Sequence, residues 1–446
     1  MEKYTKQDIL EIVNKEDIRY ICLQFSDMLG MVKSVEIPSS QLEKALDNKI
    51  MFDGSSIEGF IRINEADMYL HPDFSTFLIL DWENKSGPKV ARLICDVYKP
   101  NGMPFEGDPR FILKRNLQKM EKFGFLNFNV GFEAEFYLLK TKEDGSAKLE
   151  FSDHGGYFDM APIDRAEECR RDIVISLENM GFKMEVSHHE VGPGQNEINF
   201  TYADALSACD NIQTFKIVVK NIARKYGLYA TFMPKPVEGF AGNGMHTNCS
   251  LQDKDGSNAF DDPNADHGLS QICRKWISGI LKHSQGLCAI TNPTVNSYKR
   301  LVSGYEAPCY VAWADSNRST MIRIPSVRGL STRTEIRSVD SSTNPYLATS
   351  AILCAGLDGI ENCDKPIENI SRNLFKATQE ELDNLKITSL PENLKEAIEF
   401  LKKDSLLIEC LGNHTYSKFI EAKMCEWEKY RTQVTKWEID YYLNKL

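Results

Sequence analysis

Two glutamates in the strand-like run GFEAEFYLL, Glu133 and Glu135, are the first side chains whose spacing suggests chemistry. Side chains two residues apart on a strand project from one face, so these carboxylates point together while Phe132 and Phe136 face the other way. No Lys or Arg lies within four residues of the pair. Two carboxylates on one face repel each other and are costly to bury unless cations compensate them. The run therefore indicates either a cation site or a sheet face exposed to solvent.

A second acidic pair, Glu190 and Glu197, flanks the Gly-Pro-Gly turn of HHEVGPGQNEINF. Hard divalent cations prefer several oxygen ligands, mostly carboxylates. Together with the first pair, these glutamates could supply two cation sites. His188 and His189 are adjacent, so a strand would direct only one of them toward such a site. Both also fit ordinary surface or turn histidines.

A glycine-rich loop, KPVEGFAGNGMHTNCS, carries Gly239, Gly242 and Gly244 just before His246. Glycines at this density let backbone N–H groups approach a ligand closely. His246 beside such a loop is a candidate metal ligand or catalytic group. A glycine-rich turn followed by a histidine is also common without any function.

Arginines recur in the segment that follows this loop. In the strand-like STRTEIRS, Arg333, Glu335 and Arg337 alternate onto one face. Guanidinium groups converging from several strands suit bidentate capture of phosphate and carboxylate oxygens, although a salt-bridged surface sheet would look similar. There is no GxxxxGK[ST] loop, so carboxylates together with arginines indicate a metal–nucleotide site of another kind. The arginines are Arg300, Arg318, Arg323, Arg328, Arg333 and Arg337.

The bulk composition bounds the class of protein. A chain of 446 residues with 42% hydrophobic and 26% charged residues predicts a globular protein of two domains. A formal net charge of −11 argues against binding to nucleic acid or an anionic membrane. No apolar run is long enough to span a membrane, and the charged N-terminal segment has no signal-peptide pattern. The 12 cysteines contain no CxxC pair, which indicates reduced thiols and a cytoplasmic location.

The pattern of elements changes at a stretch rich in proline and glycine, residues 99–109. Before it, the sequence predicts mostly strands with two short helices. After it, long amphipathic helices alternate with strands, and residues 391–446 are again helical and charged. We therefore expect a small N-terminal domain over residues 1–103 and a catalytic domain over residues 104–446.

Several runs, taken in order, resemble the signatures of bacterial-type (type I) glutamine synthetases over essentially the whole chain. Each run alone is modestly specific, but their ordered combination is very specific. The runs are MFDGSSIEGFIRINEADMYL, GFEAEF, KPVEGFAGNGMHTNCS, NSYKRLVSGYEAPCY, NRS, IRIP, TRTEIRS and NPYLA.

The resemblance implies a fold and an assembly. The fold would be α+β, with a small β-grasp-like N-terminal domain and a large α/β catalytic domain built on a curved antiparallel sheet. Subunits would form a homo-oligomer, a dodecamer of two stacked hexameric rings with active sites between neighbours. The charged C-terminal helix and tail would link the rings or contact nitrogen-regulatory proteins.

The resemblance also implies a reaction: ATP-dependent ligation of ammonia to the γ-carboxylate of L-glutamate through γ-glutamyl phosphate. At least two Mg²⁺ or Mn²⁺ ions per active site would assist it. One ion would be held by Glu135, Glu190 and Glu197, and the other by Glu133, His246 and Glu335. The nucleotide would contact Tyr202, His246, Ser250, Arg318, Arg323 and Arg333. Glutamate would contact Glu190, Gly242, Arg300, Glu306 and Arg337.

Five acidic or basic residues have implied roles in catalysis or control. Asp53, from a neighbouring subunit, would bind and deprotonate ammonium, because ammonium must lose a proton to become a nucleophile. Glu306 would belong to a flap that closes over the glutamate and keeps water from the intermediate. Arg62 in EGFIRIN matches the arginine linked to feedback inhibition by glutamine. Arg318 and Arg323 would contact the transferring phosphoryl group.

The sequence departs from common family patterns at three positions. Ala241 and Asn243 replace an Asn and a Ser that many members carry in the glycine loop, which bears on glutamate affinity and on the choice of amine. Phe375 stands where the longer type I subgroup carries its adenylylated tyrosine. The chain therefore resembles the shorter, feedback-inhibited subgroup.

Three alternative functions stay open at this point. γ-Glutamylation of an organic amine uses the same chemistry, although Asp53 and Arg62 favour ammonium. A two-metal hydrolase would need neither the arginines nor the flap. A non-catalytic relative would have no reason to keep every acidic ligand.

Overall fold

The computed structural model describes residues 4–55, 57, 59, 67–83, 87–305, 307–315, 319–370, 372 and 374–446. Three of the predicted site residues, Arg62, Glu306 and Arg318, lie outside the described residues.

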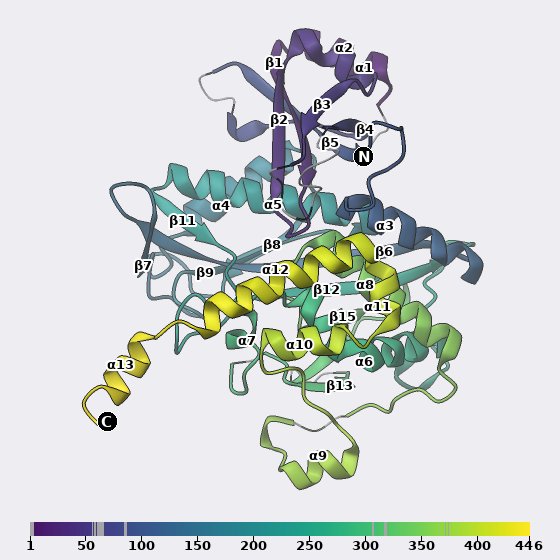
Figure 1. Cartoon of the computed structure of the whole chain (residues 1–446), viewed down its shortest axis with the longest axis vertical. Coiled ribbons are helices and arrows are strands. Elements are labelled where there is room, and N and C mark those ends of the chain that lie inside the picture. Colours follow the sequence, from purple (N-terminus) through teal and green to yellow (C-terminus); the bar gives the residue numbers. More distant parts are fainter. Residues whose placement is uncertain are drawn as a thin grey trace.

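The N-terminal part is a five-stranded sheet in the order β2-β1-β5-β4-β3, at the top of Figure 1. β1 pairs antiparallel with β2 and parallel with β5. Helix α1 follows the N-cap Thr5, and Asp8 completes a capping box. Its Ile9 and Val13 enter the core under the sheet. The elements are α1 (Lys6–Lys15), β1 (Ile18–Ser26), β2 (Val32–Pro38), α2 (Leu42–Leu46), β3 (Ile50–Asp53), β4 (Asp67–Ile79) and β5 (Lys89–Tyr98).

The second part is organised by one long strand, β6, which crosses the middle of a larger sheet in the order β13-β14-β15-β12-β6-β9-β8. β7, β10 and β11 also pair with β6. The pairings are antiparallel except for β13 and β14, which run parallel. The strands are β6 (Phe125–Thr141), β7 (Ala147–Phe151), β8 (Met184–His189), β9 (Gln195–Phe200), β10 (Ala203–Asp204), β11 (Leu228–Thr231), β12 (Met245–Asp253), β13 (Tyr310–Ala314), β14 (Thr320–Arg323) and β15 (Thr334–Ile336).

Long helices cover this sheet, and α6 and α8 pack together so closely that backbone meets backbone. A Cβ added to Gly279 would lie 2.2 Å from the carbonyl oxygen of Ala355, so only glycine fits there. The helices are α3 (Pro109–Leu117), α4 (Glu167–Asn179), α5 (Ala205–Lys225), α6 (Gln271–Thr291), α7 (Ser297–Arg300), α8 (Pro345–Asn362), α9 (Gln379–Leu385), α10 (Leu394–Leu401), α11 (Ser405–Leu411), α12 (Asn413–Arg431) and α13 (Lys436–Tyr442).

Buried polar contacts join the two parts. Arg110, at the start of α3, reaches Asp73 at 2.7 Å and Asp96 at 2.8 Å in the N-terminal sheet, and Asp210 on α5 at 2.9 Å. Asn344, the N-cap of α8, donates to the carbonyl of Asp27 in the β1–β2 turn at 3.0 Å. The N-terminal sheet is therefore fixed to the catalytic part through both charges and backbone. The predicted boundary at residue 103 falls in the connection between β5 and α3.

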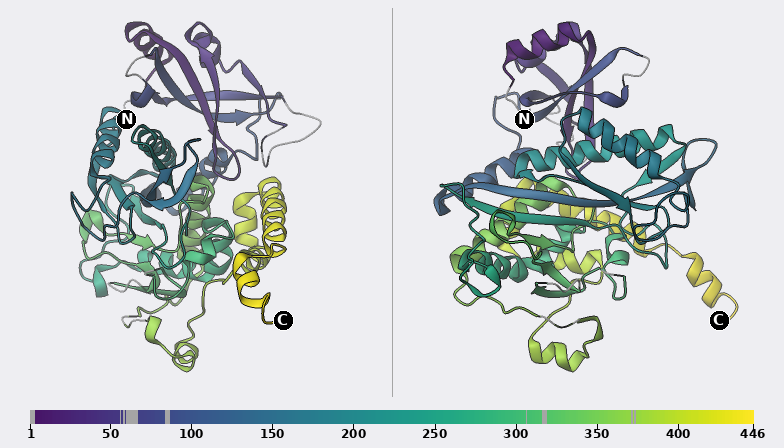
Figure 2. Two further views of the ribbon diagram at one scale, coloured as in Figure 1. Left: turned by 90° about the vertical axis from the view of Figure 1, so that its left-hand side faces the viewer. Right: turned by 180° about the vertical axis from the view of Figure 1, so that it is seen from behind.

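The chain ends in α12, which lies along the catalytic part, and α13, which projects away from it (Figures 1 and 2). α13 exposes several large apolar side chains, among them Trp437 and Ile439. No helix in the described part of the chain has the length and apolarity needed to cross a membrane. The observed architecture is the α+β arrangement expected from the resemblance.

Candidate active site

Strand pairing alone gathers acidic side chains that are far apart in the sequence. On β6, Glu133 lies opposite His246 of β12, and Glu135 lies opposite Glu197 of β9. Glu197 in turn lies opposite His188 of β8. Because directly opposed residues have neighbouring Cβ atoms, the register places these groups in a row across the sheet.

The first compact group consists of Glu133, His246 and Glu335, whose ligand atoms lie within 4.8 Å of one another. Nδ1 of His246 is 3.5 Å from a carboxylate oxygen of Glu133 and 3.7 Å from one of Glu335. Burial, reinforced by the charge of Arg337, lowers the pKa of His246 to about 3. The imidazole is therefore neutral at pH 7, which is the form that coordinates metals.

The second compact group consists of His188, Glu190 and Glu197, again within 4.8 Å of one another. The sequence predicted Glu135 with these glutamates, but His188 takes the third position of the compact group. Glu135 stands directly across from Glu197, and its Oε2 accepts a 2.7 Å hydrogen bond from the backbone N–H of Gly244. The three glutamates expected to hold one of the ions therefore remain neighbours, and His188 joins them.

The adjacent histidines divide as strand geometry requires. His188 belongs to the acidic group, whereas Nε2 of His189 lies 3.0 Å from the buried carboxylate of Asp153. Nδ1 of His189 lies 2.6 Å from the backbone oxygen of Glu190. His189 therefore fixes the backbone that presents Glu190, rather than joining the acids.

The electrostatics of this row favour cations. Burial, together with the neighbouring carboxylates of Glu135 and Glu133, raises the pKa of Glu197 to about 9. A group of acids and a neutral imidazole is the donor set expected for hard divalent ions. The residues present therefore fit two metal ions, one at each compact group.

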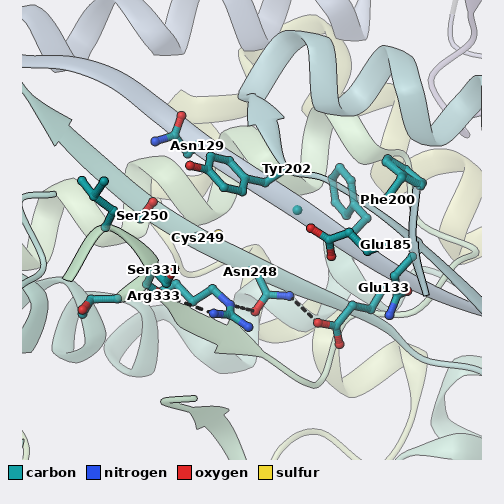
Figure 3. Close-up of a pocket in the computed structure, with 15 residues that line it drawn as sticks. Asn129, Glu133, Glu185, Phe200, Tyr202, Asn248, Cys249, Ser250, Ser331 and Arg333 are labelled. Carbon is teal, nitrogen blue, oxygen red and sulfur yellow. Dashed lines mark hydrogen bonds between the residues drawn. The ribbon is translucent and has the colours of Figure 1, made fainter. Parts of the chain in front are cut away.

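A cavity of about 190 Å³ opens beside Glu133 and is lined by Tyr202, Ser250 and Arg333, the three residues expected near a nucleoside (Figure 3). Figure 3 also shows Asn248 between Arg333 and Glu133. Asn248 donates to Glu133 at 2.9 Å and accepts from Nε of Arg333 at 3.0 Å. It thereby links Arg333 to the first acidic group.

A second cavity of about 350 Å³ is lined in part by His246. Glu190, Gly242, Arg300 and Arg337, all expected to contact glutamate, line it. Arg300 is buried and donates to the backbone oxygens of Ser338 at 2.8 Å and Arg337 at 2.9 Å. Its guanidinium is therefore held in place before any ligand enters.

The glycine loop approaches this cavity too closely for side chains. A Cβ on Gly244 would lie 2.8 Å from a guanidinium nitrogen of Arg300 and 3.0 Å from Nε2 of His246. A Cβ on Gly242 would lie 2.7 Å from Cγ of Arg300. The backbone at these two positions therefore occupies the space next to the ligand groups.

The two unusual residues of the loop have different positions. Asn243 is fully buried, donates to the backbone oxygen of Met233 at 2.9 Å and accepts from Nε2 of Gln195 at 2.9 Å. It braces the loop and is not among the residues that line the cavity. Ala241 does line the cavity, and its backbone oxygen accepts from Tyr137 Oη at 2.8 Å. A side-chain amide is therefore absent at position 241, where the ligand cavity lies.

The arginine face forms as alternation predicted, centred on the buried carboxylate of Glu335. Arg323 on β14 donates to this carboxylate at 2.6 Å, and Arg337 also pairs with it. Arg323 lies opposite Glu335 in the strand register but lines neither cavity. Its guanidinium therefore lies beside Glu335 of the first acidic group.

Asp53 is separate from these residues. It ends β3 in the N-terminal sheet, is exposed, and accepts a 2.8 Å hydrogen bond from the backbone N–H of Ser55. That bond lowers the pKa of Asp53. It lines neither cavity, so within one chain the structure does not bring it to the site.

Sequence reasoning missed three polar residues here: Asn248, Gln195 and Asp153. Asn248 could have been found from the sequence, because on a strand this residue shares a face with His246, two residues earlier. Gln195 touches Glu135, Gly242 and Asn243 from β9, and no spacing rule connects those segments. Asp153 meets His189 only through the fold.

Comparison with known proteins agrees with this geometry. Residues 17–100 match the family description "Glutamine synthetase, beta-Grasp domain", and residues 106–442 match "Glutamine synthetase, catalytic domain". Glutamine synthetase of Staphylococcus aureus (strain N315) is 57% identical over 442 residues, covering 99% of each chain. That of Staphylococcus epidermidis is 56% identical over the same share of each chain.

Solved structures give the same picture. A structure of GmaS in complex with ADP has a TM-score of 0.89 and 33% identity, covering 98% of this chain and 99% of that one. Plasmodium falciparum glutamine synthetase has a TM-score of 0.88 and 23% identity over 99% of both chains, a likeness of fold. The two family matches together span most of the sequence, and full-length relatives exceed half identity. The chain belongs to the glutamine synthetase family.

Proposed function

We propose that the two cavities form one active site for the ATP-dependent ligation of ammonia to the γ-carboxylate of L-glutamate. The reaction passes through γ-glutamyl phosphate and yields L-glutamine, ADP and phosphate. The observation that carries the proposal is that one compact group, Glu133–His246–Glu335, borders both cavities, because Glu133 lines the first and His246 lines the arginine-lined second. That arrangement suits transfer of a terminal phosphoryl group from one bound molecule to another.

Two Mg²⁺ or Mn²⁺ ions belong to this site. Glu133, His246 and Glu335 would hold the ion nearest the nucleotide phosphates. Glu135, Glu190 and Glu197, with His188 beside them, would hold the other. When bound, the ions offset negative charge on the phosphoryl oxygens.

The protein groups around the phosphates act by position and charge. Tyr202, Ser250 and Arg333 would hold the nucleoside, and Arg318 and Arg323 would contact the phosphates. Arginines that are fixed beforehand stabilise charge that develops during transfer without a cost of reorganisation. The bonds of Arg323 to Glu335 and of Arg333 to Asn248 support this role.

The glutamate would lie in the second cavity. Arg300 and Arg337 would bind its carboxylates, Gly242 would let its backbone approach closely, and Glu306 would close over it. Once phosphorylated, the γ-carboxylate has a good leaving group. Asp53 of a neighbouring subunit would take a proton from ammonium, and the ammonia formed would then attack.

The finer assignments rest on resemblance. We assign the chain to the type I enzymes that are inhibited by glutamine through Arg62, and not adenylylated because Phe375 replaces the tyrosine. A dodecamer of two hexameric rings would bring Asp53 to the active site of a neighbouring subunit. This would account for the separation of Asp53 from both cavities of its own chain. The exposed apolar side chains of α13 suit a contact between rings or with a nitrogen regulator. We place the enzyme in the cytoplasm, where ATP and glutamate are available.

The decisive experiment measures phosphate release from ATP while glutamate, ammonium and divalent metal are each omitted in turn. We expect release to require all three. ATP hydrolysis independent of glutamate would identify a hydrolase, and the absence of both metal binding and turnover would identify a non-catalytic relative.

A panel of amines distinguishes the ligase from a γ-glutamylating relative. Ala241 places no amide in the glutamate cavity, so the panel includes methylamine and a polyamine beside ammonium. Glutamine should be the main product. A strong preference for an organic amine would show that this amine, rather than ammonia, is the substrate.

Feedback control has its own test. Arg62→Ala should relieve inhibition by glutamine while turnover is retained. Glu306→Ala should leave glutamate binding and weaken the inhibition. Inhibition curves identical to the wild type would remove these residues from the control mechanism.

A further inference from the structure

A third cavity, of about 670 Å³, lies between the N-terminal sheet and the catalytic domain. It shares no lining residue with either active-site cavity. Its walls come from the β1–β2 turn region, from α5 and β11, and from residues 341–343. Because it lies where the two parts of the chain meet, a ligand in it would touch both.

Two lysines one turn apart on α5 line this cavity, Lys216 and Lys220. The ammonium of Lys216 donates to the backbone oxygen of Ser341 at 2.8 Å, which uses one of its three donors. In the described part of the chain, neither lysine forms an ion pair with a carboxylate. Both ammonium groups lie near the ring of Phe232, at 6.0 and 5.9 Å from its centroid.

This placement is unfavourable for two cations. Burial, together with the neighbouring charge of Lys220, lowers the pKa of Lys216 to about 7. Burial also lowers the pKa of Lys220. Lys220 is exposed to solvent, whereas Lys216 is half-buried, and the repulsion between the two like charges is relieved when an anion binds between them. The third lysine at this cavity, Lys423, is already paired with Glu426 at 3.0 Å.

Other groups at the cavity complete a recognition surface. The hydroxyl of Ser341 is buried and has no hydrogen-bond partner among the described residues. Such a group is costly unless a ligand or water satisfies it. The wall around the lysines is apolar and includes Leu29, Ile217, Tyr229 and Phe232.

We propose that this cavity binds a small organic anion, whose phosphate or carboxylate head is held by Lys216, Lys220 and the Ser341 hydroxyl. Its apolar body lies against Phe232 and the β1–β2 turn. The combination of a few convergent polar groups with an apolar wall is typical of small-molecule sites. The site is distinct from the one that holds ATP and glutamate.

The test is calorimetric titration of the full-length protein with phenyl phosphate and, separately, with benzoate, in the presence of saturating ADP and Mg²⁺. These ligands carry the two candidate heads on the same ring, so the tighter one identifies the head. We expect saturable binding of at least one. In the double variant Lys216→Met/Lys220→Met, binding should be at least about tenfold weaker, because two charge-assisted contacts are lost.

Controls make the result specific. Lys395→Met, which changes an exposed lysine on α10, should bind like the wild type. Ser341→Ala changes little volume and should weaken binding several-fold, so it serves if the double variant does not fold by circular dichroism. No binding to the wild type, equal binding to Ser341→Ala or to a folded double variant, or competition by glutamate would overturn the proposal.

Discussion

The carboxylates around Arg110 and the carboxylates around Glu197 are both withdrawn from water, but the chain treats them differently. Asp73, Asp96 and Asp210 surround a buried guanidinium at 2.7 to 2.9 Å. Although burial opposes its charge, Asp210 and Asp96 raise the pKa of Arg110. The first cluster thus contains its own cation.

The second cluster lacks such compensation. Among the described residues, no Lys or Arg forms an ion pair with Glu135 or Glu197. Burial and the neighbouring carboxylates instead raise the pKa of Glu197 to about 9. A buried acid that is paired with a cation of the same chain therefore stabilises the fold, whereas buried acids that face one another indicate a site for external cations.

The largest expected effect is on turnover. Glu197→Gln should lower turnover at least about 10³-fold, equivalent to about 4 kcal/mol, because a proposed metal ligand loses its charge. Phosphate release from ATP measures it. Glu143→Gln, at an exposed turn, is the matched control and should keep full activity.

The same variant should not lower the stability of the metal-free protein. The folded pKa of Glu197 lies above its unfolded value, so the native state holds the extra proton between about pH 4.5 and 9. Stability contributed by this group therefore falls as pH rises through that window, and Gln removes the fall. A large loss of stability in metal-free Glu197→Gln at pH 8 would contradict the comparison.

The opposite pattern is expected at the paired cluster. Arg110→Met should lower the free energy of unfolding by about 3–5 kcal/mol, since three carboxylates lose their buried partner. Chemical unfolding with and without metal measures it. Arg171→Met removes an exposed ion pair with Glu167 and should change stability by less than about 1 kcal/mol.

Metal removal sharpens the contrast further. Mg²⁺ or Mn²⁺ at about 100 times its Kd should stabilise the wild type by about 2.7 kcal/mol, and chelation should reverse this. Because the pKa of Glu197 is about 9 without metal, binding at pH 7 should release protons. Glu197→Gln should lose most of both effects. Equal stabilisation of this variant and the wild type would place the ions elsewhere.

The smallest expected effect is on the stability contributed by His283, a histidine that is paired with carboxylates of the same chain. His283 lies 2.6 Å from Asp404 and 3.0 Å from Asp358. Burial opposes its charge, but hydrogen bonds to these carboxylates raise its pKa. Its stabilisation is therefore complete below the unfolded pKa of about 6.5 and is lost as pH rises through the folded value.

His283→Gln should accordingly cost about 1 kcal/mol at pH 6 and less at pH 9. Unfolding curves at the two pH values measure the difference. The exposed His154→Gln should show no such dependence. A cost that grows with pH would mean that His283 is not held as a cation.

Much of the site could be predicted because its residues follow strand periodicity. The two-residue spacing of Glu133 and Glu135, and of Arg333, Glu335 and Arg337, fixed their faces before the partners were known. Which residues lie opposite each other depends on the register of five strands, and local spacing does not encode that register. His188 in place of Glu135 in the second compact group is one result of that register.

The elements of the fold also divide into those that local sequence patterns predict and those that depend on tertiary contacts. α1, α5 and the early strands follow their local patterns closely. α8 escaped prediction because it is buried on nearly every side, so it lacks the polar stripe that reveals an amphipathic helix. The network around Arg110 was also beyond prediction, since its three acids lie in different elements.

The length of β6 has one more consequence. Glu133 and Glu135 stand on the same uninterrupted strand, so about 7 Å of rigid backbone separates them whatever the surrounding loops do. The strand thus fixes the spacing between the first compact group and the acids around Glu197. Inserting or deleting one residue between the two glutamates would turn one of these carboxylates to the far face of the sheet.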